Sequence, residues 1–182
     1  MNMETKKVYL VLSQTGTMFS RVLKFFTGAE YNHSSISLDP TLQEMYSFGR
    51  LNPYNPFIGG FVKEGIHIGT FKRFYKTTAM VLELPVTDEQ YHNIELLIEH
   101  MKNNKTFFHY NYWGVFCAIF KTNYAPRRRF YCSQFVRACL ASFGISNSKE
   151  LPKIIKPIDF LKLKNKRVIY KGVLQNYNVI EG

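Results

Sequence analysis

Arg127–Val136 reads RRRFYCSQFV, and within it a basic loop passes into a helix at Cys132. Beyond the cysteine, apolar residues at positions 135, 136, 139, 140 and 143 follow helical spacing, and Gly144 supplies a C-terminal stop. A helix N-terminus with cations beside it lowers the pKa of a thiol. The stretch therefore predicts a core-facing helix that opens with Cys132, which serves either as a nucleophile or as a small buried hydrophobe.

All five histidines precede Cys132, so a thiol–imidazole pair must place the histidine first along the chain. His33 is the strongest candidate because residues 31–40 (YNHSSISLDP) alternate polar and apolar side chains, as in a half-buried strand, and end in an Asp-Pro turn. His67, in a second strand-like run, is the reserve candidate. His92 and His100 are expected at solvated positions on a helix. His109 is expected to pack among aromatic residues.

Asn32–Leu38 (NHSSISL), followed far downstream by Tyr131–Val136 (YCSQFV), resembles the permuted papain-fold (NlpC-type) thiol hydrolases. This branch includes the YiiX-like proteins and the lecithin–retinol acyltransferase-like enzymes. Tyr110–Phe116 (YNYWGVF) resembles the Tyr-Asp-Trp-x-Gly helix start that precedes the cysteine in the branch. Lys156–Leu161 (KPIDFL) resembles its Pro-x-Asp-Leu segment. The resemblance runs from about residue 13 to residue 170 and so covers most of the chain.

The resemblance implies an α+β, papain-like fold in which a small, mostly antiparallel sheet or open barrel packs against the cysteine-bearing helix. His33 would accept or share the Cys132 proton, and the thiolate would attack an acyl carbon. The backbone N–H of Cys132, at a helix N-terminus, would form half of an oxyanion site. The resemblance also places Tyr110 near the pocket, and we expect no cofactor.

The third catalytic residue departs from the family pattern. Relatives carry Glu or His in the strand after the histidine, and the corresponding strand here, Glu44–Gly49, offers Ser47. Serine is a weak orienter because it lacks the carboxylate charge that stabilises an imidazolium. Glu64, one strand later, is the better chemical candidate, and we favour it over Ser47. If neither serves, a binding role gains support.

Length and composition, with 46% hydrophobic and 16% aromatic residues, predict one domain over residues 1–182, and the resemblance implies that it is a hydrolase domain. Three cysteines, an odd number, favour reduced thiols and a cytoplasmic location over a disulfide framework. Val8–Leu12 is too short for a signal-peptide core or a membrane span. No Cys-x-x-Cys occurs, so we expect no metal. Cys117 and Cys139 fit packing positions.

The net charge of +11 and a pI near 9.6 indicate attraction to anionic partners. Arg127–Arg129 is the sharpest local expression of this charge. Arg129, with Tyr131, is a candidate for tuning the Cys132 pKa or for binding substrate, although the arginines equally fit a solvated loop. An anionic lipid surface is a candidate partner. Nucleic acid is not favoured, because no zinc-finger, RNA-recognition or helix-turn-helix signature is present.

The rest of the chain predicts strands over residues 8–12, 79–84 (ended by Pro85) and 167–170. It predicts helices over residues 18–26 and, behind the capping box Thr87–Gln90, up to residue 101. Residues 52–60, with two prolines and two glycines, are expected to form a loop that overhangs the site.

Three functions compete. The first is a cysteine hydrolase that cleaves an amide bond in a peptide or γ-linked peptide. The second is an acyltransferase or lipid-amide hydrolase of the same fold, acting on an acyl-amide substrate. The third is a catalytically idle basic module that binds membrane or nucleic acid. Six aromatic residues suit the second as a pocket wall, unless they belong to the core: Phe107, Phe108, Tyr110, Tyr112, Trp113 and Phe116.

Overall fold

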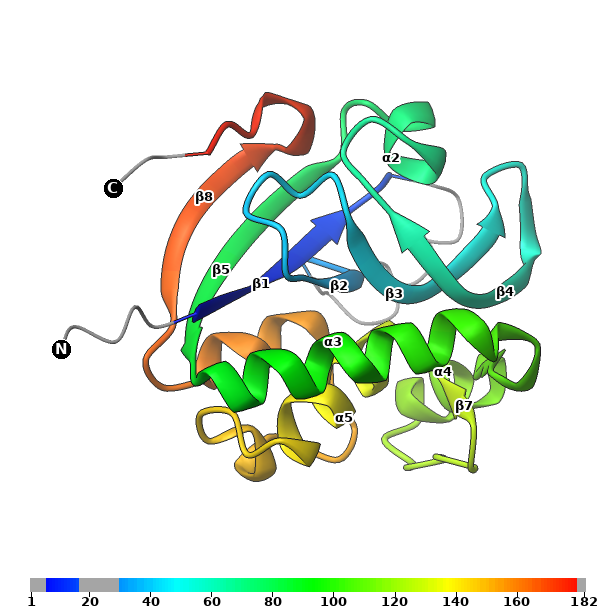
Figure 1. Cartoon of the computed structure of the whole chain (residues 1–182). Coiled ribbons are helices and arrows are strands. Elements are labelled where there is room, and N and C mark those ends of the chain that lie inside the picture. The colour runs from blue at the N-terminus through cyan, green and yellow to red at the C-terminus, as the bar shows by residue number, and fades with distance from the viewer. Residues whose placement is uncertain (1–5, 17–29, 180–182) are drawn as a thin grey trace, which may run out of the picture.

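Eight strands of the described chain form one open, mixed sheet in the order β7-β6-β4-β3-β2-β1-β5-β8 (Figure 1). The computed structural model describes residues 6–16 and 30–179. Neighbouring strands are antiparallel except for β6 and β7, which are parallel. The strands are β1 Lys6–Gln14, β2 His33–Ser37, β3 Met45–Asn52, β4 Asn55–Glu64, β5 Thr78–Val86, β6 His109–Tyr110, β7 Arg129–Phe130 and β8 Arg167–Val173.

Helices cover both faces of this sheet. Figure 1 shows α3, α4 and α5 on one side and α2 on the other. The α-helices are α2 Gly69–Arg73, α3 Asp88–Asn103, α4 Tyr112–Ile119 and α5 Cys132–Ser142. The 3-10 helices are η1 Lys105–Phe107, η2 Ser148–Glu150, η3 Pro157–Lys162 and η4 Leu174–Asn176. No helix in the described part of the chain is long and apolar enough to cross a membrane.

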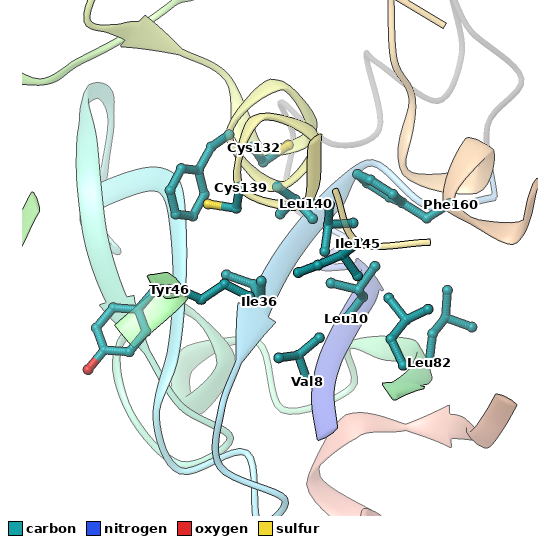
Figure 2. Close-up of a cluster of buried hydrophobic side chains, with 14 of the residues drawn as sticks. Val8, Leu10, Ile36, Tyr46, Leu82, Cys132, Cys139, Leu140, Ile145 and Phe160 are labelled. Carbon is teal, nitrogen blue, oxygen red and sulfur yellow. The ribbon is translucent and has the colours of Figure 1, made fainter. Parts of the chain in front are cut away.

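Strand β1 is apolar without alternation because its two faces enter two separate cores. Val8 and Leu10 join the cluster beneath α3 and α5, where Figure 2 shows them beside Ile36 of β2. Tyr9 and Val11 point the other way and pack in the cluster that includes Phe71 of α2. A strand buried on both faces reads as a continuous apolar run. β1 therefore belongs at the centre of the sheet, beside the strand that carries His33.

Helix α5 packs across β2 and β3 through the apolar stripe that its spacing predicted. Phe135, Val136, Cys139 and Leu140 are buried, and Gly144 follows the helix with a φ of +63°. That left-handed φ is one that glycine adopts without strain. The expectation of a core-facing helix opened by Cys132 is therefore confirmed.

Most other expected elements are confirmed, but one strand does not end where the sequence placed its end. Strands cover residues 8–12, 79–84 and 167–170, and Thr87 and Gln90 cap α3 reciprocally. Pro85 lies inside β5 instead of ending it. The register with β8 stops at Glu83, so Pro85 falls where that side of β5 needs no ladder donor. The helix expected over residues 18–26 lies outside the described residues.

The loop expected over residues 52–60 is instead a tight turn followed by β4. The side chain of Asn52 accepts a hydrogen bond from the backbone N–H of Tyr54 at 2.8 Å, which closes the turn within a few residues. Gly59 belongs to the strand. A Cβ at Gly59 would lie 2.8 Å from the Tyr112 hydroxyl and 2.9 Å from Tyr110 Cβ, so the glycine permits close approach of the segment that carries α4.

The aromatic junction between α5 and the sheet is expected to carry much of the stability. The Phe48 ring is fully buried, with ring centroids of Phe61, Phe130 and Phe135 5.2–5.8 Å away. Phe48→Ala should lower the free energy of unfolding in urea by about 3–5 kcal/mol, whereas the exposed Phe107→Ala should change it by less than about 0.5 kcal/mol. A loss below about 1 kcal/mol for Phe48→Ala would contradict this packing.

Candidate active site

Three separate element ends bring the candidate catalytic residues together. His33 is the first residue of β2, Glu64 is the last residue of β4, and Cys132 is the first residue of α5. Strand β3 lies between β2 and β4, so the His33 and Glu64 side chains meet over it. The two residues are 31 positions apart in sequence, and Cys132 is 100 positions from its contact Asn32. The site is thus assembled only by the sheet and by the docking of α5.

Glu64 holds the His33 ring through one nitrogen. His33 Nε2 lies 3.0 Å from Oε1 and 3.1 Å from Oε2 of the carboxylate, and the Ser35 hydroxyl donates to Oε2 at 2.6 Å. Burial by itself raises the pKa of Glu64, but the His33 charge and the hydrogen bonds outweigh burial and lower it. Glu64 is therefore an ionised carboxylate below the protein surface, and the Nδ1 atom of His33 remains for the thiol.

His33 is a cation in this setting. Burial lowers the pKa of the imidazole, but the Glu64 charge and the hydrogen bonds to Cys132 and Glu64 outweigh burial and raise it to about 10. The imidazole thus stays protonated across neutral pH. The Phe71 ring lies against it with a centroid separation of 6.2 Å and helps to exclude water from this side of the site.

The surroundings of Cys132 favour its thiolate form by lowering its pKa. Burial raises its pKa, but the hydrogen bond and charge of His33 outweigh burial, and the Ser34 backbone N–H and the Ser133 hydroxyl add to the lowering. The sulfur lies 3.9 Å from both the Asn32 carbonyl oxygen and Ser133 Oγ. Cys139, buried about two helical turns further along α5, has no such partners, and burial raises its pKa. Only the first of the two buried α5 cysteines therefore has an environment that favours its anion.

Ser47, the alternative third residue, does not contact the imidazole. Its hydroxyl is fully buried on β3 and lies near the Glu64 carboxylate, where it helps to lower the Glu64 pKa. Its neighbour Gly49 explains how Glu64 reaches across β3. A Cβ at Gly49 would lie 3.3 Å from Glu64 Oε1, 3.4 Å from His33 Cε1 and 3.4 Å from Ser47 Oγ. The absent side chain at Gly49 makes the space in which the charge pair forms.

Two contacts that the sequence did not reveal fix the position of Cys132. Ser34 of β2 and Ser133 of α5 share a buried hydrogen bond of 3.1 Å between their hydroxyls. The Asn111 side chain donates to Gln134 Oε1 at 3.0 Å and accepts from the Gly114 N–H at 2.8 Å, which joins the start of α4 to the first turn of α5. Gly114 is required here, because a Cβ would collide with the Asn111 amide.

Cys132 opens onto a mostly apolar pocket. Its walls come from the segment before β2, from β6, α4 and the start of α5, and from the chain that enters η3. The lining residues are Tyr31, Asn32, Tyr110, Val115, Ala118, Ile119, Tyr131, Cys132, Ser133, Ile155, Lys156 and Pro157. Burial and then the Cys132 charge raise the pKa values of both Tyr110 and Tyr131. The two phenols therefore remain neutral hydrogen-bond donors beside the sulfur.

Several residues lie elsewhere than the sequence suggested. Arg129 is exposed on β7, and the groups that lower the Cys132 pKa are His33, Ser34 and Ser133 instead. His67 is exposed in a turn, so it is no reserve base, and His109 is exposed on β6 instead of packed. Of the six aromatic residues proposed as a pocket wall, Tyr110 is the one that lines the pocket described above. Of the other five, Phe108 is half-buried. The remaining four are exposed: Phe107, Tyr112, Trp113 and Phe116.

No protein-family model matches this chain, and a search of curated proteins finds no match either. Within residues 6–16 and 30–179, no group of three or more His, Cys, Asp or Glu side chains is placed to hold a metal ion. The chemistry assigned to the site therefore rests on the geometry and electrostatics of Cys132, His33 and Glu64.

Replacing the buried carboxylate should weaken the Cys132 thiolate. In Glu64→Gln the imidazole loses its anionic partner, so its pKa falls and the Cys132 pKa rises in turn. The pH midpoint of iodoacetamide labelling at Cys132, followed by mass spectrometry, should move up toward about 8.5, the value for a free thiol. Glu44→Gln, which removes an exposed carboxylate paired with Lys63, is the matched control and should leave the midpoint unchanged. An unaltered profile in Glu64→Gln would remove Glu64 from the site.

The His33–Glu64 pair should also make stability depend on pH. The folded pKa of His33 is raised from 6.5 to about 10, so its stabilising contribution is complete below pH 6.5 and is lost as the pH rises toward 10. Cys132→Ser is the proper background, because an ionising thiol would release a compensating proton. In urea unfolding, the advantage of Cys132→Ser over Cys132→Ser/His33→Gln should shrink above pH 6.5. A pH-independent difference would contradict the raised pKa.

Proposed function

We propose that this protein is a permuted papain-like thiol hydrolase that cleaves an amide bond in a peptide or γ-linked peptide through a thioester acyl-enzyme. The observation that carries the proposal is the charge chain Glu64–His33–Cys132 at the wall of a pocket. A nucleophile beside a base that a third group orients is the recurring arrangement of covalent acyl transfer. The cysteine at a helix start and the histidine at a strand start also agree with the family resemblance.

The acylation step follows from the charge states. The Cys132 thiolate forms a bond to the carbonyl carbon of the substrate, and the C=O electron pair moves onto oxygen. When the tetrahedral intermediate collapses, the C–N bond breaks, and the His33 imidazolium gives its proton to the departing amine. Glu64 keeps the ring orientation throughout and stabilises its charged form. The products of this step are a free amine and a Cys132 thioester.

Deacylation reverses the proton's route. The now neutral His33 takes a proton from water, the resulting hydroxide attacks the thioester carbon, and the C–S bond breaks to release a carboxylic acid and the thiolate. An oxyanion forms in both steps and needs donors. The Cys132 N–H is available because the first N–H groups of a helix have no intrahelical partner. The neutral Tyr110 phenol, on the same pocket wall, is the second donor we propose.

The apolar pocket favours a second candidate of the same chemistry, an acyltransferase or lipid-amide hydrolase. Val115, Ala118 and Ile119 from α4 line the pocket together with Ile155 and Pro157, and Lys156 is the one charged residue in the lining. Such a wall suits an aliphatic acyl group or an apolar side chain next to the scissile bond. The two candidates differ in the acyl acceptor and in the size of the group that enters the pocket.

The test is to trap the acyl-enzyme. Wild-type protein incubated with a panel of peptide amides and fatty acyl amides should gain the acyl mass on Cys132, and hydroxylamine should remove it. Cys132→Ala should show no adduct, and His33→Ala should accumulate it at least about 100-fold more slowly because the leaving amine gets no proton. Adducts from peptide amides alone support the hydrolase, and adducts from acyl amides alone support the lipid-directed candidate. If Cys132 reacts with neither panel and labels no faster than Cys117, the site is a catalytically idle binding module.

A further inference from the structure

Helix α4 exposes an aromatic face to solvent. Trp113 is 68% exposed, Phe116 52% and Phe120, just past the helix, 65%. Their positions at i, i+3 and i+7 place them on one side of the helix. The rings also touch in series, with centroids 5.9 Å apart for Trp113–Phe116 and 5.1 Å apart for Phe116–Phe120. Tyr124 extends this α4 surface into the following loop and is 45% exposed. A contiguous exposed patch of this kind marks an interaction site.

The α4 surface sits in an entirely basic region. Residues 100–149 contain eight Lys or Arg residues and no Asp or Glu. Lys105, Lys121 and Arg127–Arg129 from this region are all exposed. The parallel pairing of β6 with β7 brings the arginine loop back beside the start of α4, where the His109 N–H donates to the Arg128 carbonyl at 3.0 Å. The arginines therefore border the aromatic face.

The opposite side of the same helix forms part of the candidate active site. Val115, Ala118 and Ile119 line the pocket that contains Cys132. Figure 1 shows α4 and β7 together at one end of the molecule, beside the end of α3. Whatever binds the α4 surface is thus separated from the pocket by the thickness of one short helix.

We infer that the α4 surface is a docking site for an anionic lipid bilayer. Aromatic rings partition into the boundary between headgroups and acyl chains, and cations around them attract anionic headgroups. Each Lys or Arg near an anionic membrane adds to the binding, and acidic residues would oppose it. The α4 helix has eight residues, so it lies in the interface and does not span it. Single-stranded nucleic acid is disfavoured because the sequence carries no zinc-finger, RNA-recognition or helix-turn-helix signature.

The chain carries its own reporter for this test, because Trp113 is its single tryptophan. The full-length protein is mixed with vesicles of equimolar phosphatidylcholine and phosphatidylglycerol, or of phosphatidylcholine alone. Trp113 emission and co-sedimentation are then followed together. With the anionic vesicles at about 0.1 M salt, emission should shift to the blue and the protein should sediment; at about 1 M salt both effects should fall at least tenfold. Neutral vesicles should bind at least about tenfold more weakly.

Matched variants separate the aromatic and the basic contributions. Phe116→Ala/Phe120→Ala, which keeps Trp113, should lower the partition coefficient at least about tenfold. Tyr54→Ala/Tyr75→Ala removes two exposed rings near α2, on the other face of the sheet, and should change it less than about twofold.

Two charge variants complete the set. Arg127→Gln/Arg129→Gln should lower the partition coefficient about 30-fold. Lys72→Gln/Lys76→Gln removes the same charge from the region of α2 and should lower the partition coefficient less than about threefold. Circular dichroism melts of every variant show that its fold is kept.

Three results would overturn the docking surface. One is no sedimentation with anionic vesicles. The second is sedimentation without a shift in Trp113 emission, which would place the contact elsewhere. The third is tighter binding to a single-stranded RNA oligonucleotide than to the vesicles, with quenching of Trp113. None of these readouts uses Cys132 chemistry, so loss of the proposed hydrolase activity leaves the docking test intact.

Discussion

The buried ion pair between Glu64 and His33 is the interaction on which the whole site depends. A carboxylate below the surface is costly unless it is paired and hydrogen-bonded. Here the imidazolium and the Ser35 hydroxyl meet both requirements. The same imidazolium offsets the cost of a buried thiolate at Cys132. The three charges are therefore mutually dependent, and the loss of the central cation would leave two buried anions to be neutralised by protons.

The fold leaves room for the His33–Glu64 pair because the side chains of β3 are small at this point. Strand β3 separates β2 from β4, and a strand with large side chains on that face would keep His33 and Glu64 apart. Ser47 and Gly49 leave the space open. The two-sided core fixes where β2 lies, since β1 beside it is buried on both faces. The Ser34–Ser133 hydrogen bond then sets α5 against β2, so packing and polar contacts together determine the position of the sulfur.

Locally encoded features could be predicted from the sequence, whereas the reach of side chains across the sheet could not. Helical spacing after Cys132 and strand alternation after His33 are short-range patterns, and both elements formed as expected. The choice between Glu64 and Ser47 could not be made from strand order alone, because it depends on the space at Gly49 across a neighbouring strand. Gly49 at the end of the expected strand is the one sequence signal that could have indicated this space.

Composition proved a poor guide to burial in the segment around α4. The cluster of aromatic residues predicted a pocket wall or a core, yet Trp113 and Phe116 lie on the surface. An eight-residue helix has two faces, and only its small and aliphatic residues, such as Ala118, face the pocket. Residues 52–60 misled in a similar way, since Gly59 serves close packing within β4 and no loop forms there.

The central claim is that Cys132 and His33 exist as a thiolate–imidazolium pair at neutral pH. The direct measurement is the ultraviolet absorbance of the thiolate, recorded against pH for the wild type. The same titration of Cys132→Ser is subtracted from it. The account predicts a difference signal already present at neutral pH, which disappears in one step on acidification. A difference signal that appears only near pH 8.5 or above, about where a free thiol ionises, would contradict it.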